Sequence, residues 1–333
     1  MKTNYTALLA AVIIAALLST VMNSPAADAK LEPASLKYGL YIHYGMPTFA
    51  NQGEQGQIPV ERFSPTALDV KQWTRTAKEA GMNFSILTAK HDSGFCLWDS
   101  ANYDYDVGNS PFKADIIADF IAACKAEGIA PGIHYSIPDA YNEGEVRHKG
   151  PVPPPYFNVI KKHVTELHTK YPQIRIQIFD DDGTRLTPAQ YKELCEIIQQ
   201  LNPQCLILNH VYEPRHTSAT VIKSWMWWAG AQFNTPQFLF DRYNQSRVAS
   251  RPFLLNVGPD RTGSIPAKQI AVLMGVKKLI DNPTTTQPTA PAAAPVTQPD
   301  AGERLKKLKS LFDQGLINKE DYDKKVKEIM NSL

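Results

Sequence analysis

The sequence predicts an α/β fold in which a parallel sheet closes into a barrel of the TIM type. Apolar, β-branched segments alternate with amphipathic helical segments from about residue 36 to residue 280, with short links between them. Several apolar segments end in polar or aromatic residues, as strands do where a parallel barrel builds an active site. A doubly wound nucleotide-binding fold is the alternative, but no Gly-rich phosphate-binding motif follows the first strand. The barrel is therefore favoured.

The expected strands are rich in Ile, Leu, Val, Tyr and Phe. They lie at residues 36–44, 84–87, 129–136, 174–179, 205–208, 221–228 and 252–257. The expected helices have apolar residues near one face and lie at residues 65–80, 113–127, 156–170, 187–201, 236–248 and 267–280. Gly81 and Gly128 follow two of the helices as stop signals, and Thr187-Pro188 is typical of a helix start.

The first residues are typical of a secretory signal. Lys2 supplies the positive start, residues 7–22 are an apolar run, and Ala27-Asp28-Ala29 has the small-x-small form of a cleavage site. A retained membrane anchor is the alternative, but the run is short for a span and lacks a basic flank. We therefore expect residues 1–29 to be a signal peptide and the mature protein to be secreted or periplasmic, without a membrane span.

The composition changes after residue 281, where the predicted barrel domain (30–281) ends. Residues 282–301 form a Pro/Thr/Ala-rich linker with too few large apolar groups to fold. Residues 302–333 carry two short apolar stripes, one ending at Gly315 and one starting after Asn318, and these predict a two-helix unit. Because helices this short are marginal alone, we expect the unit to pack on a copy of itself or on another protein.

Charge and cysteine content narrow the choice of partners and cofactors. The formal net charge is +2, which suggests neither a nucleic acid nor an anionic membrane as partner. The four cysteines show no metal-binding spacing and are expected to be mostly small buried hydrophobic residues, with a Cys195–Cys205 disulfide as the alternative. No metal and no cofactor are expected.

Candidate functional residues lie at the predicted carboxyl ends of the strands, which share one face of a parallel barrel. They are His43, His91, His134 with Tyr135, the carboxylates Asp180, Asp181 and Asp182, Glu213, and Trp225, Trp227 and Trp228. A carboxylate that leaves an apolar strand beside His and Tyr donors suits a nucleophile attacking a sugar anomeric carbon. The alternatives are a polar turn at residues 180–183 and tryptophans that belong to the core. The histidines lack metal-ligand spacing, so hydrogen bonding to substrate hydroxyls is their favoured role.

Several long stretches carry a resemblance to a known family. They are KYGLYIHYG (37–45), LTAKHDSGFCLWDS (87–100), IFD (178–180), SWMWWAGAQFNTPQFLFDRYNQS (224–246) and FLLNVGPDRTGSIP (253–266). From about residue 37 to residue 280, the chain resembles the α-L-fucosidases of glycoside hydrolase family 29. The tail from Gly302 is similar to the short C-terminal domain called SHOCT. The first resemblance implies a TIM-type barrel and a retaining mechanism, with a carboxylate nucleophile and an acid/base about 5–5.5 Å apart.

The resemblance also implies roles for individual residues. Asp180 would be the nucleophile, and Glu213 is chosen as the acid/base because it is the only Glu between the fifth and sixth expected strands. The implied substrate-binding set is His43, Tyr44, His91, Asp92, Tyr135, Trp225, Trp227 and Trp228. Within this set the histidines would bind fucose hydroxyls and the tryptophans would wall the methyl side of the sugar.

Three positions depart from the family pattern. Asp92-Ser93-Gly94 stands where the family has a second histidine and then Asp-Gly, and Tyr44 stands where it has a Trp. The run Asp180-Asp181-Asp182-Gly183 replaces a single Asp-Gly, so Asp181 and Asp182 are alternative positions for the nucleophile.

We therefore expect an exported retaining α-L-fucosidase that removes terminal fucose from glycans. Asp180 would attack the sugar, and Glu213 would protonate the leaving oxygen and then activate water. Two alternatives are a non-catalytic barrel that binds sugar or scaffolds an assembly, and a hydrolase of the same barrel type that acts on another deoxy or galacto-configured sugar.

Overall fold

The computed structural model describes residues 31–51, 58–146, 149–181, 185–209, 225–228 and 234–283, with isolated positions in the C-terminal segment. The chain divides into two compact units, residues 1–281 and 282–333. The expected signal segment, nearly all of the linker and most of the two-helix unit lie outside the described residues. Among the helices that the structure describes, none is long and apolar enough to cross a membrane.

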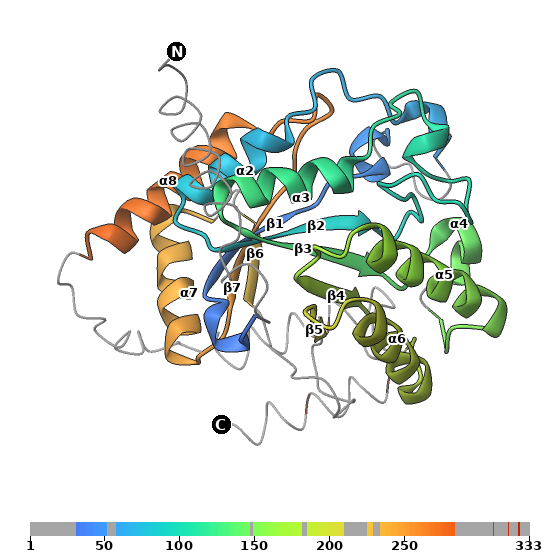
Figure 1. Ribbon diagram of the computed structural model, residues 1–333. Helices are drawn as coiled ribbons and strands as arrows, with labels where there is room; N and C mark the ends of the chain where they lie inside the picture. Colours follow the sequence, from blue (N-terminus) through green and yellow to red (C-terminus); the bar gives the residue numbers. More distant parts are fainter. Residues whose placement is uncertain are drawn as a thin grey trace, which may run out of the picture. The chain divides into compact units, whose positions relative to one another are not determined.

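A seven-stranded parallel sheet forms the centre of the first unit (Figure 1). Its strands are β1 (Tyr38–Ile42), β2 (Phe84–Lys90), β3 (Ala130–Ser136), β4 (Ile176–Asp180), β5 (Leu206–Asn209), β6 (Trp225–Trp228) and β7 (Phe253–Val257). Their order is β5-β4-β3-β2-β1-β7-β6, so β1 pairs with both β2 and β7. This order follows the chain around a ring and does not reverse at a switch point, as a doubly wound sheet would. The predicted α/β architecture of the TIM type is confirmed.

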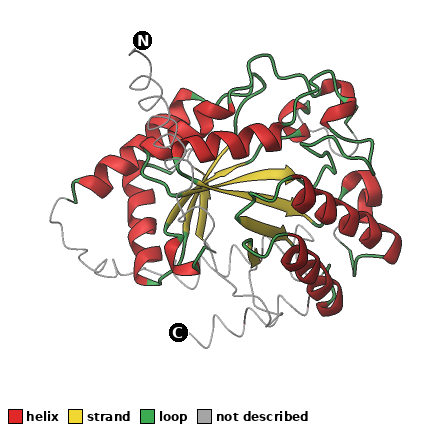
Figure 2. Cartoon of the chain, in the orientation of Figure 1, coloured by secondary structure: helices red, strands yellow, loops and turns green. Residues whose placement is uncertain are grey.

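Helices alternate with the strands and pack against the sheet (Figure 2). They are α2 (Val70–Glu79), α3 (Ile116–Glu127), α4 (Ala140–Glu143), α5 (Pro154–Lys170), α6 (Pro188–Leu201), α7 (Pro236–Val248) and α8 (Ala267–Asp281). Helix α2 begins later than expected because Asp69 caps it and the Ala67 N–H donates to the Thr262 carbonyl, outside the helix. Helix α3 ends where predicted, at Gly128, which has a left-handed φ of 66°.

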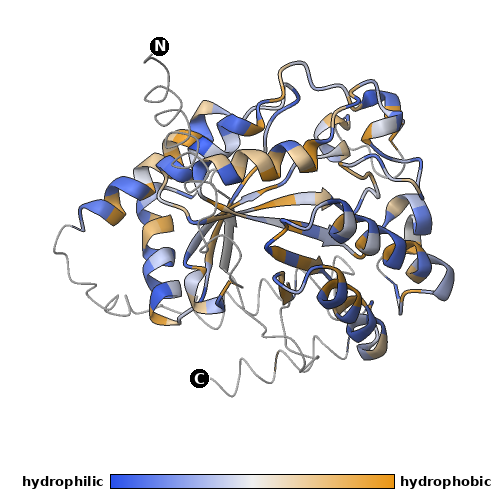
Figure 3. Cartoon of the chain, in the orientation of Figure 1, coloured by the Kyte–Doolittle hydropathy of each residue, from blue (hydrophilic) through white to orange (hydrophobic). Residues whose placement is uncertain are grey.

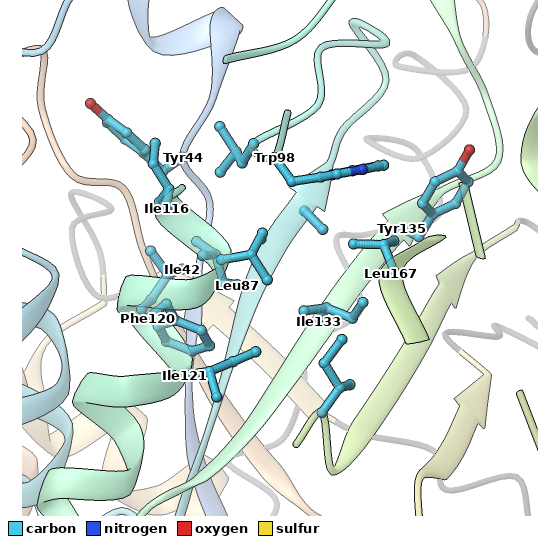
Figure 4. Packing of buried hydrophobic residues seen from close by; sticks show 14 of the residues in the cluster. Ile42, Tyr44, Leu87, Trp98, Ile116, Phe120, Ile121, Ile133, Tyr135 and Leu167 are labelled. Atoms are coloured by element: carbon cyan, nitrogen blue, oxygen red, sulfur yellow. The ribbon is translucent and has the colours of Figure 1, made fainter. Parts of the chain in front are cut away.

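Apolar residues lie on both faces of the sheet. Figure 4 shows Ile42, Leu87 and Ile133, from three neighbouring strands, packed near Phe120 and Ile121 of α3. This layer is continuous with the apolar sides of the helices, which carry hydrophobic and hydrophilic residues in alternation (Figure 3).

A second, smaller cluster fills the opposite face, which is the barrel interior. Its members are Leu36, Tyr41, Phe84, Ile86, Ile176, Ile178, Leu206, Leu208 and Leu254. A Cβ atom on Gly39 would lie only 2.5 Å from the Phe84 ring, so glycine makes room for this large side chain. Apolar side chains therefore fill the barrel interior below the strand ends, as in other barrels of this type. The polar residues lie above them, at the carboxyl ends of the strands.

The four cysteines, Cys96, Cys124, Cys195 and Cys205, are buried free thiols. This agrees with their predicted role as small hydrophobic residues, and the alternative Cys195–Cys205 disulfide is not formed.

Candidate active site

Polar side chains from neighbouring strands meet at the carboxyl end of the sheet. His43 follows β1, His91 follows β2, and His134 lies near the end of β3. The ring centroids are 5.2 Å apart for His43 and His91, 5.9 Å for His43 and His134, and 5.7 Å for His91 and His134. The structure thus brings three of the sequence-predicted histidines into mutual contact.

Asp180, the last residue of β4, lies next to this histidine cluster. Its Oδ2 atom is 3.3 Å from Nε2 of His134, whose side chain is 1% exposed, whereas the Asp180 side chain is 37% exposed. The carboxylate is therefore contacted by a buried imidazole and still open to solvent, as a group that must reach a substrate has to be.

Tyr41 forms the floor beneath two of the imidazoles. Its ring contacts His43 and His134 edge to face, with centroids 4.5 Å and 5.5 Å apart. Burial and the nearby Asp180 carboxylate raise the pKa of Tyr41 well above its ordinary value, so its hydroxyl stays neutral. The floor is thus aromatic and uncharged.

His43 is oriented by Asn256 in β7. The His43 Nδ1 atom lies 2.7 Å from the Asn256 amide oxygen, and a carbonyl oxygen can only accept, so Nδ1 carries the proton. In the neutral ring the other nitrogen, Nε2, is then an acceptor. Asn256 was not among the predicted site residues, although the same signal could have found it, because it lies near the end of an apolar strand.

His91 is neutral over most of the physiological pH range. Burial lowers its pKa, and the neighbouring His134 and Lys90 lower it further; these effects outweigh the opposite effect of Asp180 and Asp92 and bring the pKa to about 4. A neutral imidazole offers one donor and one acceptor, which suits paired contacts with sugar hydroxyls.

The structure separates Asp180 from the alternative nucleophile Asp181. Asp181 is buried, and its two carboxylate oxygens accept the backbone N–H groups of Arg185 and Leu186 at 3.0 Å. These bonds close the turn that follows β4, which assigns Asp181 a role in loop structure. Asp182 lies outside the described residues.

Two predicted substrate-binding residues point into packed layers of the protein. Tyr135 is fully buried, and its hydroxyl lies 2.9 Å from Nδ1 of His163 in α5, on the helix side of the sheet. Tyr44 packs against Trp73, with ring centroids 5.3 Å apart, although it also borders the cavity described below. The structure therefore does not bring Tyr135 together with the histidine cluster.

Asp92 follows His91 in a turn at the edge of the cluster. Its carbonyl accepts the Ala140 N–H at 2.8 Å, which ties the loop after β2 to the loop after β3. Glu213 lies outside the described residues, as do the side chains of Trp225, Trp227 and Trp228. The backbone of the three tryptophans belongs to β6 and pairs with β7.

A cavity of about 460 Å³ opens beside His43 and His91. Its lining residues come from β2 and from the segments that follow β1, β2 and β7: His43, Tyr44, Gly45, Pro47, Thr48, Thr88, His91, Gly258 and Pro259. A larger cavity of about 810 Å³ lies along α5, lined by residues such as Lys162 and Thr169, and does not include any of the strand-end residues. The smaller cavity is therefore the one that the predicted site residues His43 and His91 line.

The fold and the site resemble those of one class of protein. A parallel α/β barrel that presents a solvent-open carboxylate among imidazoles at its strand ends is an arrangement that suits glycoside hydrolysis. Residues 56–215 match the family described as Alpha-L-fucosidase, and residues 303–330 match SHOCT, the Short C-terminal domain. The resemblances predicted from the sequence, to the α-L-fucosidases and to SHOCT, are confirmed.

Individual relatives agree with this family match. The chain is 26% identical to Alpha-L-fucosidase 1 of Arabidopsis thaliana over 289 residues, which cover 70% of this chain and 56% of the relative. It is 27% identical to Putative alpha-L-fucosidase 1 of Oryza sativa subsp. japonica over 293 residues, covering 74% of this chain and 56% of the relative. The matched region thus spans little more than half the length of these curated relatives.

Solved structures share the fold. A putative alpha-L-fucosidase from Bacteroides thetaiotaomicron superposes with a TM-score of 0.63 at 25% identity, covering 75% of this chain and 66% of that chain. Alpha-L-fucosidase AlfC from Lactobacillus casei, solved with α-L-fucose product, gives a TM-score of 0.64 at 22% identity, covering 75% and 97%.

Proposed function

We propose that the protein is a retaining glycoside hydrolase that releases terminal α-L-fucose from glycans. The observation that carries the proposal is the Asp180 carboxylate, which ends β4 in contact with buried His134 and remains open to solvent. The fucosidase relatives support the choice of sugar. So do the solved complexes of AlfC, one with α-L-fucose and one with Fuca(1,6)GlcNAc.

The reaction would take two displacements. In the first, an Asp180 oxygen forms a bond to the anomeric carbon while the bond to the leaving oxygen breaks and an acid protonates that oxygen. In the second, water attacks the same carbon, the acid residue now accepts the water proton, and Asp180 leaves as a carboxylate. We assign the acid/base role to Glu213. His134 would donate to Asp180 and hold one of its oxygens toward the sugar.

The remaining polar groups would bind the sugar hydroxyls. Nε2 of His43 and the neutral ring of His91 present acceptors and donors at the cavity that both residues line. We assign Asp92 to the same set because it directly follows His91, and Trp225, Trp227 and Trp228 to the apolar side of the sugar, on which aromatic rings pack well.

Export and assembly are part of the proposal. The apolar N-terminal run followed by Ala27-Asp28-Ala29 supports secretion or delivery to the periplasm, where fucosylated glycans are accessible. We also propose self-association through residues 302–333, because the two helices predicted there from the sequence are short and marginal alone.

The decisive experiment is hydrolysis of an aryl α-L-fucoside by the wild type, Asp180→Ala and Asp181→Asn. We expect Asp180→Ala to lose turnover by at least a thousandfold and to recover part of it with azide, which replaces the missing nucleophile and yields β-fucosyl azide. Asp181→Asn should keep most of the activity, because Asp181 accepts backbone N–H groups.

Each alternative function has its own outcome in this assay. Folded wild type that binds fucose without turnover would support the non-catalytic barrel, and turnover of a different deoxy-sugar glycoside alone would support another specificity. Full activity of Asp180→Ala would remove Asp180 from the nucleophile position.

A further inference from the structure

A β-bulge lies at the end of β2, directly before His91. The register with β3 runs from Thr88 opposite His134 to Lys90 opposite Tyr135, so β2 has one residue more than β3 across this step. Without the bulge, strict alternation would place Lys90 on the same face as Thr88 and would turn His91 to the helix side. With it, Lys90 lies on the helix side with Tyr135, and His91 contacts His43 and His134.

Lys90 is held on the helix side by a buried ion pair. Its Nζ atom lies 3.0 Å from Oδ2 of Asp139, and both side chains are 0% exposed. The ammonium also donates to the Pro138 carbonyl at 3.3 Å and sits 4.9 Å from the centre of the Tyr135 ring. These directional contacts define one position for the end of the Lys90 side chain.

Asp139 is in turn fixed from several sides. It caps α4 by accepting the Asn142 N–H at 2.8 Å, and the Tyr156 hydroxyl donates to it at 3.2 Å. Burial alone would raise the pKa of the Asp139 carboxyl, but Lys90 and the hydrogen bonds from Asn142 outweigh it and lower the pKa. Asp139 is therefore a charged and immobile partner for Lys90.

Asp139 also lies against the turn that carries His91. A Cβ atom on Gly94 would be 2.4 Å from Asp139 Oδ1, and Gly94 has a φ of 89°, which disfavours other residues. The next residue, Ala140, donates its N–H to the Asp92 carbonyl at 2.8 Å. The ion pair therefore fixes Lys90, and the hydrogen bond from Ala140 fixes Asp92, so residues on both sides of His91 are held in place.

We propose that the Lys90–Asp139 pair is a positioning device that holds the β2 bulge and so aims His91 into the active site. A buried ion pair is weak evidence for stability, because apolar side chains of similar size often pack as well. Its particular contribution is geometric, since it fixes which residue of β2 faces the helices. Both side chains are fully buried on the helix side, so both would act through His91.

The test compares the wild type with Lys90→Met/Asp139→Asn, a double variant that removes both charges and keeps a side chain able to cap α4. The primary readout is the NMR titration of the His91 ring, assigned with His91→Gln. We expect its midpoint to rise from about 4 toward the ordinary imidazole range near 6.5, partly because the Lys90 charge that lowers it is removed and partly because the ring loses its buried contacts. For the aryl α-L-fucoside, we expect KM to rise at least tenfold with a smaller change in kcat.

Two further variants make the result specific. Asp139→Asn alone keeps the cap and the Lys90 charge. Since the Lys90 charge lowers the pKa of His91, a rise of the His91 midpoint in this variant reports displacement of the ring. Lys161→Met/Glu193→Gln is the matched control, since Lys161 also pairs with a carboxylate at 2.9 Å and also lies over an aromatic ring, that of Phe157, at 5.2 Å. This control should leave the His91 titration unchanged.

An unchanged or lowered His91 midpoint in folded Asp139→Asn would overturn the proposal. An equal shift in the Lys161 control would overturn it too, because the effect would then not be specific to the Lys90–Asp139 pair. The KM arm rests on the proposed function, whereas the titration does not. If the wild type fails to hydrolyse fucosides and the titration still shifts, the proposed function fails and the positioning role stands.

Discussion

Replacement of His134 tests how the site holds its carboxylate. His134→Phe keeps a planar ring near Tyr41 but removes the Nε2 atom that lies 3.3 Å from Asp180 Oδ2. A hydrogen bond to a charged group contributes about 1.5–3 kcal/mol, and each ~1.4 kcal/mol is a tenfold change in rate. We therefore expect kcat/KM for an aryl α-L-fucoside to fall about ten- to hundredfold. Thermal unfolding should show that the variant is folded.

A second substitution separates the hydrogen bond from the packing of the ring. His134→Gln can present an N–H close to the position of Nε2, so it should recover part of the activity that His134→Phe loses. The assay is steady-state hydrolysis of the same fucoside, with kcat and KM determined for each variant. Wild-type activity in His134→Phe would refute the reasoning, as would a Gln variant no better than the Phe variant.

Two further predictions concern buried polar groups. The Ser136 hydroxyl is buried without a hydrogen-bond partner among the described residues, and Ser136 lies in register with Asp180, so Ser136→Ala should lower kcat/KM without lowering the unfolding midpoint. The Ser85 hydroxyl is also buried without a hydrogen-bond partner among the described residues, but it lies near the start of β2, away from the strand ends that carry the site. Ser85→Ala should therefore leave kcat/KM unchanged. Burial lowers the pKa of His163 to about 3 and that of His168 to about 4, whereas unfolded imidazoles ionise near 6.5. The unfolded state therefore binds protons first, and the stability is complete above about pH 6.5 and lost toward pH 4, by about 2 kcal/mol per histidine at pH 5. Urea unfolding at pH 7 and pH 5 measures this difference, and equal free energies at the two pH values would contradict it.

The sequence was sufficient to predict where the strands lie, although β1 ends at Ile42 and β2 at Lys90 instead of at residues 44 and 87. It was less sufficient to predict which way the side chains face. His43 and His91 could be found because each follows an apolar segment that is buried along its whole length. In a strand that is covered on both faces, no polar side shows which alternate residues face the barrel interior and which face the helices. His134 and Tyr135 were therefore equally plausible site residues. The structure resolves this choice, because His134 contacts Asp180 and Tyr135 contacts His163.

Two further features could not be predicted for a related reason. They are the bulge at Lys90 and the different contacts of Asp180 and Asp181. A bulge is a mismatch between two strands, and the residues Ala89 to Asp92 give no local sign of it. Likewise, consecutive aspartates differ only in what surrounds them. Asp181 meets two backbone N–H groups of the following turn, whereas Asp180 meets an imidazole from a neighbouring strand.

The distribution of charge at the strand ends favours an uncharged sugar over an anionic substrate. Lys90 is next to His91 in the sequence, but its ammonium lies on the helix side and is neutralised by Asp139. His91, with a pKa of about 4, brings no positive charge to the site near pH 7, and the partly exposed Asp180 carboxylate would repel a phosphate or a carboxylate. A pyranoside can instead exchange its hydration for hydrogen bonds with imidazoles, without the cost of burying a charge. Under the proposed function the bulge would therefore serve recognition twice, because it turns the neutral His91 ring toward the strand-end site and the Lys90 cation away from it.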